Sequence, residues 1–265
     1  MVLCMAATSE RGAAVGALRS RQLLGPLLLA AAATWAAVVA IWRSLGAMPG
    51  TMGLGVAAFG GVWILMMAAM MLPSVAPFAS FYTRTFTDRR RRRLVAFTAG
   101  YLLVWTAAGL PVFGLAWIAD RLVTAHPGAA TAFAALIFLV CGLYQLTPFK
   151  DRCLARCRSP LAFTLEHAAH RGRGRDLRAG MSHGVFCVAC CWAIMLLLVA
   201  FGLMNVLAML IIAAVVLAEK TWRWGGGVAR AFGVASIVLA LVVVAHPAVA
   251  PGLYSPNPTM TEGTM

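Results

Sequence analysis

Residues 180–220 read GMSHGVFCVACCWAIMLLLVAFGLMNVLAMLIIAAVVLAEK, and this almost unbroken apolar stretch decides the class of the protein. About 20 apolar residues cross the hydrocarbon core of a bilayer as a helix, so the stretch is long enough to cross twice. The residues FGLMN at its centre leave almost no room for a loop. The stretch therefore predicts two membrane spans, 180–201 and 203–220, joined in a tight hairpin.

The same criterion, applied outward, predicts an all-α polytopic transmembrane bundle of seven spans. The other five are 23–42, 54–73, 95–118, 129–148 and 227–246. Composition agrees, since 62% of the residues are hydrophobic, 11% are charged and the mean hydropathy is +0.86. The first span resembles a signal peptide because it follows Arg19 and Arg21, but its apolar run continues to Trp42, which predicts a retained helix.

Basic residues indicate how the bundle is oriented. A net charge of +14 suggests nucleic-acid binding, but the arginines alternate with apolar runs and do not line a soluble domain. Of 22 Lys and Arg residues, 20 fall on connections of one side, and only Arg43 and Arg121 fall on the other. The positive-inside rule then predicts a cytoplasmic tail 1–22, a transmembrane domain 23–248 with a cytoplasmic loop 149–179, and an external tail 249–265.

The span 180–201 carries a set of side chains suited to a metal ion. His183, Cys187, Cys190 and Cys191 fall at about 0°, 40°, −20° and 80° around a helix, so they share one face. A thiol alone is only weakly polar, but a histidine among apolar residues costs free energy unless it is bound. At 1.5 Å per residue, the set reaches from about 5 Å to about 15 Å below the cytoplasmic surface. We therefore predict a metal site here.

Methionines in the span 54–73 reach the same depth from an antiparallel helix. The segment WILMMAAMMLPS places Met66, Met67, Met70 and Met71 within about 140° of arc and about 5 to 12 Å from the same surface. Methionine stripes commonly serve packing, so both packing and metal binding by Met67, Met70 and Met71 stay open. A mixture of Cys, Met and His favours Cu(I) over zinc, magnesium, calcium or manganese.

The loop 149–179 carries a second pair of thiols. Cys153 and Cys157 are four residues apart, which places them on one face if the segment is helical. The neighbouring basic residues are expected to lower the pKa values of these thiols toward thiolate. The pair could bind zinc or pass on a soft cation, although its spacing is not that of a zinc finger. We expect an exposed transfer point at the membrane surface.

The remaining intramembrane polar residues receive structural interpretations. Glu219 and Lys220 end the span 203–220 and are expected to lie at the interface as a solvated pair. Gln145 is expected to bond a neighbouring helix, Cys141 to be inert, and Asn205 to cap a helix start.

Three segments carry a resemblance to a known family: WILMMAAMMLPS, CGLYQLTPFKDRCLARCRSPLAF, and GMSHGVFCVACCW followed by MN and an EK-terminated span. They resemble a bacterial family of integral membrane proteins labelled "predicted metal-binding", a domain of unknown function. The resemblance covers roughly residues 58–222 and leaves the first and last spans outside. It implies metal binding in the bacterial inner membrane, with signature residues at Cys153, Cys157, His183, Cys187, Cys190 and Cys191.

Three functions remain open. The first is a membrane protein, not an enzyme, that binds or moves a soft cation such as Cu(I) and exchanges it with a metal donor or acceptor protein. The second is a thiol-disulfide oxidoreductase, because Cys187 and Cys190 have C-x-x-C spacing. The third is a scaffold or assembly subunit with structural cysteines. No P-loop is present in the sequence, which argues against ATP-driven pumping.

Overall fold

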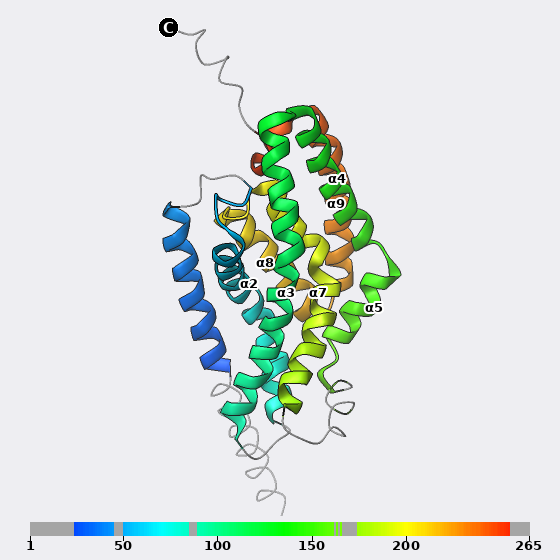
Figure 1. Cartoon of the computed structure of the whole chain (residues 1–265). Coiled ribbons are helices and arrows are strands. Elements are labelled where there is room, and N and C mark those ends of the chain that lie inside the picture. The colour runs from blue at the N-terminus through cyan, green and yellow to red at the C-terminus, as the bar shows by residue number, and fades with distance from the viewer. Residues whose placement is uncertain are drawn as a thin grey trace, which may run out of the picture.

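The computed structural model describes residues 24–44, 50–84, 89–161, 163, 165 and 174–254, and they form a bundle of helices (Figure 1). Among these residues the regular structure is helical throughout, which confirms the all-α fold class. The α-helices are Leu24–Ser44, α2 (Val56–Arg84), α3 (Arg90–Ala125), α4 (Pro127–Gln145), α5 (Pro148–Cys157), α7 (Arg175–Phe201), α8 (Val206–Thr221) and α9 (Gly225–Ala245). Two 3-10 turns, Pro247–Val249 and Pro251–Leu253, follow α9.

Six of the described helices are long and apolar enough to cross a membrane: Leu24–Ser44, α2, α3, α4, α7 and α9. The helix α8 occupies the position of the remaining predicted span but has 16 residues, a length of about 24 Å against a core of about 30 Å. Asn205 caps its start as expected, because its side-chain oxygen accepts a hydrogen bond from the backbone N–H of Ala208 at 3.1 Å. The six long apolar helices are compatible with the predicted multi-pass membrane protein. The orientation of the bundle and the domain boundaries stay predictions.

Helices α3 and α7 lie side by side through the centre of the bundle (Figure 1). They approach at glycines, since a Cβ atom on Gly100 would collide with the carbonyl oxygen of Leu177, and one on Gly180 with that of Phe97. Only residues without a side chain allow two helix backbones to come so close. This crossing fixes the N-terminal half of α7, which carries His183 and the cysteines, against α3.

Helix α5 turns the predicted loop back onto the bundle and contacts α7 (Figure 1). Thr147 caps its start by accepting a hydrogen bond from the backbone N–H of Lys150 at 3.2 Å, and Pro148 occupies the first turn, where no N–H is needed. Its buried residues follow helical spacing: Lys150, Cys153, Leu154 and Cys157. The first part of the loop is therefore an amphipathic helix whose inner face carries both thiols.

Candidate metal centre

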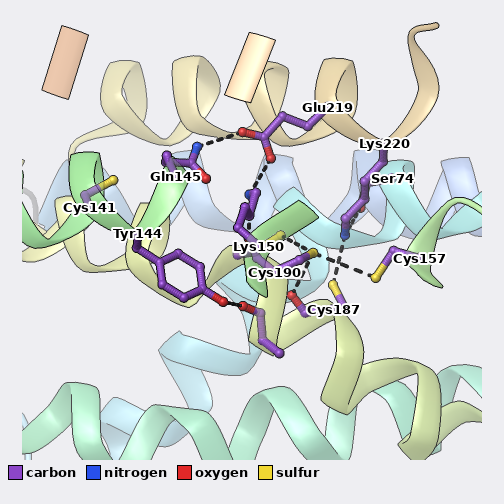
Figure 2. Close-up of polar contacts among 12 residues, drawn as sticks. Ser74, Cys141, Tyr144, Gln145, Lys150, Cys157, Cys187, Cys190, Glu219 and Lys220 are labelled. Carbon is purple, nitrogen blue, oxygen red and sulfur yellow. Dashed lines mark hydrogen bonds and ion pairs between the residues drawn. The ribbon is translucent and has the colours of Figure 1, made fainter. Parts of the chain in front are cut away.

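Four buried cysteines, which we call the thiol cluster, meet where α5 packs on α7: Cys157, Cys187, Cys190 and Cys191. Figure 2 labels Cys157, Cys187 and Cys190 among them. The Cys190 sulfur lies 3.3 Å from that of Cys191 and 3.7 Å from that of Cys157. It also donates to the backbone carbonyl oxygen of Cys187 at 3.2 Å. Helix α7 supplies three of the sulfurs from one face, as its sequence predicts, and α5 supplies the fourth.

Each of the two sulfur–sulfur distances is compatible with two sulfurs bound to the same metal ion. They are too long for a disulfide of about 2.05 Å but shorter than the roughly 4.6 Å that two sulfurs bonded to one ion at about 2.3 Å can span. All six cysteines in the described part of the chain are free. Within those same residues, no group of three or more His, Cys, Asp and Glu side chains is placed to hold a metal ion. Side chains would have to move to form a complete coordination sphere.

Cys153 and Cys157 are buried, with 7% and 6% of their surfaces exposed, so the expected exposure of this pair is wrong, whereas its role in metal transfer stays a prediction. The packing of α5 on α7 removes them from solvent. Burial also raises the pKa of Cys153, although the nearby Lys150 ammonium acts to lower it. The expected lowering toward thiolate is therefore wrong for Cys153, because the loss of solvation outweighs the positive charge.

Lys220 reaches into the bundle. Its ammonium group donates to the sulfur of Cys187 at 2.9 Å and to the hydroxyl oxygen of Ser74 at 3.3 Å. The Tyr101 hydroxyl lies 3.0 Å from the same sulfur. The Cys187 sulfur of α7 thus meets side chains of α3 and α8. Lys220 links it to Ser74 of α2 (Figure 2). The expectation that Lys220 points its ammonium group into solvent at the interface is wrong, because the group contacts Cys187 and Ser74 inside the bundle.

Glu219 is fully buried, so its interpretation as an interface residue is also wrong. Its carboxylate accepts from the Lys150 ammonium at 2.7 Å and from the Gln145 side-chain amide at 2.8 Å (Figure 2). The predicted bond from Gln145 to a neighbouring helix is thereby confirmed. Lys150 also donates to the backbone carbonyl oxygen of Cys190 at 2.5 Å. Sequence reasoning missed Lys150, although its place three and seven residues before Cys153 and Cys157 puts it on their face.

His183 is buried in an aromatic box. Its ring stacks on Phe78 with centroids 3.8 Å apart, and the rings of Phe97, Tyr101 and Phe163 lie 5.7 to 5.9 Å away. It stands one turn before Cys187 on the same helix face, as predicted. The Cys190 sulfur, by contrast, receives its contact from outside α7 from the sulfur of Cys157.

The four methionines of α2 are all buried: Met66, Met67, Met70 and Met71. Met70 and Met71 lie one turn before Ser74, whose hydroxyl donates to the Met71 carbonyl oxygen at 2.9 Å and accepts from Lys220. This part of α2 therefore adjoins the side chains around Cys187. Burial suits packing and metal binding equally, so the role of Met67, Met70 and Met71 stays a prediction.

A comparison with known families relates the chain to copper. The model of the PpoB2 family, described as a copper chaperone, matches residues 60–243, more than half of the 265-residue chain. The chain belongs to this family. No curated protein and no solved structure matches the chain. The family match includes all the candidate ligands and the residues that contact them, and it agrees with the metal-related part of the resemblance noted in the sequence.

Proposed function

We propose that this PpoB2-family protein is a multi-pass protein of the bacterial inner membrane that holds Cu(I) at the thiol cluster and passes it to a partner protein. The observation that carries the proposal is the 3.7 Å approach of the Cys157 and Cys190 sulfurs, which brings ligands of two helices together inside the bundle. Copper is the cargo of the protein. Holding and passing on an ion makes and breaks no bond within a substrate, so we assign the chain no enzymatic activity.

The chemistry of the cluster suits Cu(I). Thiolates and thioethers are soft ligands, and they favour this ion over the hard divalent cations and, where methionine takes part, over zinc. Cys190 is central to the proposed site, because it has contacts to both Cys157 and Cys191 and stands one turn after Cys187. One methionine of α2 would supply a neutral ligand. Cys153, one turn before Cys157 on α5, is the proposed next sulfur on the path of the ion, and His183 a further ligand at its cytoplasmic end.

Substitution of Cys190 tests this function. The full-length protein, purified in detergent under reducing conditions, is titrated with Cu(I) against a chromophoric chelator. We expect Cys190→Ser to weaken Cu(I) binding at least about a hundredfold, since a hydroxyl is a poor ligand for a soft ion. The matched control is Cys141→Ser, because Cys141 is equally buried but its thiol lies 3.9 Å from Ser236 on α9, outside the thiol cluster. Full Cu(I) affinity in Cys190→Ser refutes the proposed site.

The sulfur distances also favour one second function, thiol-disulfide exchange. Cys157 and Cys190 need to approach by less than 2 Å from their 3.7 Å separation to form a disulfide. Thiol trapping in native membranes followed by mass spectrometry separates the two functions. Reduced thiols protected by copper support the chaperone. A stable fraction with a disulfide from Cys190 to Cys157 or Cys187 supports the oxidoreductase.

A further inference from the structure

Two lysines reach the thiol cluster, and their charges are balanced in different ways. The Lys150 ammonium lies 2.7 Å from the carboxylate of Glu219, so that pair is neutral by itself. Lys220 has no carboxylate within ion-pairing distance among the residues that the structure describes. Its contacts there are the Cys187 sulfur at 2.9 Å and the Ser74 hydroxyl at 3.3 Å. The positive charge of Lys220 is therefore directed at a proposed metal ligand.

The surrounding groups hold Lys220 in this position. The Ser74 hydroxyl donates its hydrogen to the Met71 carbonyl oxygen, so its lone pairs are free to accept from the ammonium group. Ser74 and Cys187 are both buried, with 6% and 0% of their surfaces exposed. Lys220 itself is half-buried, so its charge acts on the buried Cys187 sulfur with weaker screening than in bulk water.

The net charge of the metal-bound cluster shows how the Lys220 ammonium affects metal binding. Two thiolates with a univalent ion carry a net charge of −1, which the ammonium of Lys220 brings to zero. Two thiolates with a divalent ion are already neutral, and Lys220 then leaves a net charge of +1. An unbalanced charge inside an apolar bundle is costly. The lysine thus stabilises one of the two loaded states and destabilises the other.

We propose that Lys220 is the internal counter-cation of the thiol cluster and makes it prefer univalent over divalent soft cations. The inference rests on the proposed function, since it names the valence of the ion that the same cluster holds. Lys220 acts through Cys187 and does not bind the ion, so it is a specificity-determining residue and not a ligand.

Titration with two redox-inert ions tests the inference. Ag(I) serves as the univalent probe and Zn(II) as the divalent one, each added to the reduced full-length protein with a competing chelator. We expect Lys220→Met to weaken Ag(I) binding about tenfold or more and to strengthen Zn(II) binding or leave it unchanged, because the lysine charge balances the univalent complex and opposes the divalent one. Lys220→Arg keeps the charge and should restore most of the preference for Ag(I).

A second pair of variants neutralises Lys220 without removing it. Ser74→Asp places a carboxylate beside the ammonium group, whereas Ser74→Asn adds similar bulk without charge. We expect Ser74→Asp to lower Ag(I) affinity further than Ser74→Asn does. The comparison of these two Ser74 variants tests the counter-cation role of Lys220 even if Lys220→Met does not fold.

The outcomes separate the inference from the proposed function. If the wild-type protein binds no Ag(I), the proposed site itself is wrong. If the wild type binds Ag(I) but Lys220→Met and Lys220→Arg lose Ag(I) and Zn(II) by the same factor, Lys220 only packs the site and the counter-cation role is wrong. Equal Ag(I) affinities for Ser74→Asp and Ser74→Asn contradict it as well.

Discussion

The ammonium group of Lys150 donates a 2.5 Å hydrogen bond to the backbone carbonyl oxygen of Cys190, and both residues are buried. This bond joins α5 to α7 at the residue whose thiol also meets Cys157. The charge that Lys150 brings into the bundle is balanced by Glu219 of α8 at 2.7 Å. The position of Cys157 in the thiol cluster therefore depends on a salt bridge with a third helix.

Breaking that salt bridge should release α5. We expect Glu219→Gln to destabilise the protein by about 3–5 kcal/mol, because it leaves the Lys150 ammonium buried without a counter-charge. Thermal unfolding in detergent measures the loss, and alkylation of Cys157 followed by mass spectrometry should become faster. The control is Asp151→Asn, which breaks the exposed pair with Arg230 and should cost less than about 1 kcal/mol. Unchanged stability and alkylation in Glu219→Gln would contradict the role of the pair.

The glycine crossing of α3 and α7 should tolerate no side chain. Gly100→Ala forces the Leu177 backbone away and should lower the thermal midpoint and weaken Cu(I) binding, since Tyr101 then moves from Cys187. Gly114→Ala on the same helix is the matched control, because its added Cβ meets no atom within 4 Å. Equal thermal midpoints for the two variants would show that the helices do not approach as closely as described.

If a methionine of α2 binds the metal ion, two buried methionines on the same face of the helix, Met70 and Met66, should respond differently to substitution. We expect Met70→Leu, which keeps the volume but removes the thioether, to weaken Cu(I) binding several-fold with little change in stability. Met66→Leu, one turn farther from Ser74, should leave Cu(I) binding unchanged. A competition titration measures both variants. If the two behave alike, the methionines of α2 serve packing only.

The thiol of Cys153 should be slow to alkylate at neutral pH. Its pKa is raised by burial, so the thiolate forms only at higher pH than in an ordinary cysteine, and the alkylation rate should keep rising beyond the usual titration range. Peptide mapping of the apo protein after timed alkylation at several pH values gives the rate. A rate that levels off below the ordinary thiol pKa would mean that the thiolate is stabilised instead.

Topology reporters decide whether α8 crosses the membrane. We expect fusions after Arg93 and Arg178 to report a cytoplasmic position, and fusions after Arg121 and at the C-terminus an external one. These positions follow from the positive-inside rule and seven spans. A cytoplasmic C-terminus would show that the 16 residues of α8 do not span and that six helices do.

The apolar pattern was sufficient to predict the helices and the shared face of Cys187, Cys190 and Cys191. Membrane spans depend on local hydrophobicity, and the residues that share a helix face follow from their spacing. Both can therefore be predicted without knowledge of tertiary contacts. The predicted level of the α2 methionines stays a prediction, although Ser74 of the same helix contacts Lys220 beside Cys187.

The polar contacts of the thiol cluster could not be predicted in this way. Glu219 and Lys220 end an apolar helix, where charged side chains usually turn to the interface, and only partners from distant segments make burial favourable. Lys150 precedes Glu219 by 69 residues, and no local pattern links them. The docking of α5 likewise depends on this partner, which is why a basic segment with two cysteines suggested an exposed loop.

The order of synthesis gives the distance between Lys150 and Glu219 a further meaning. A chain that leaves the ribosome carries α5 and the cysteines of α7 well before α8 is made. Before Glu219 has been synthesised, the Lys150 ammonium has no buried counter-charge. Burial of α5 is then unfavourable, and we expect the helix to remain in water. We then expect the sulfurs of Cys157 and Cys190 to stay apart, so that the proposed copper site forms only after α8 has been made.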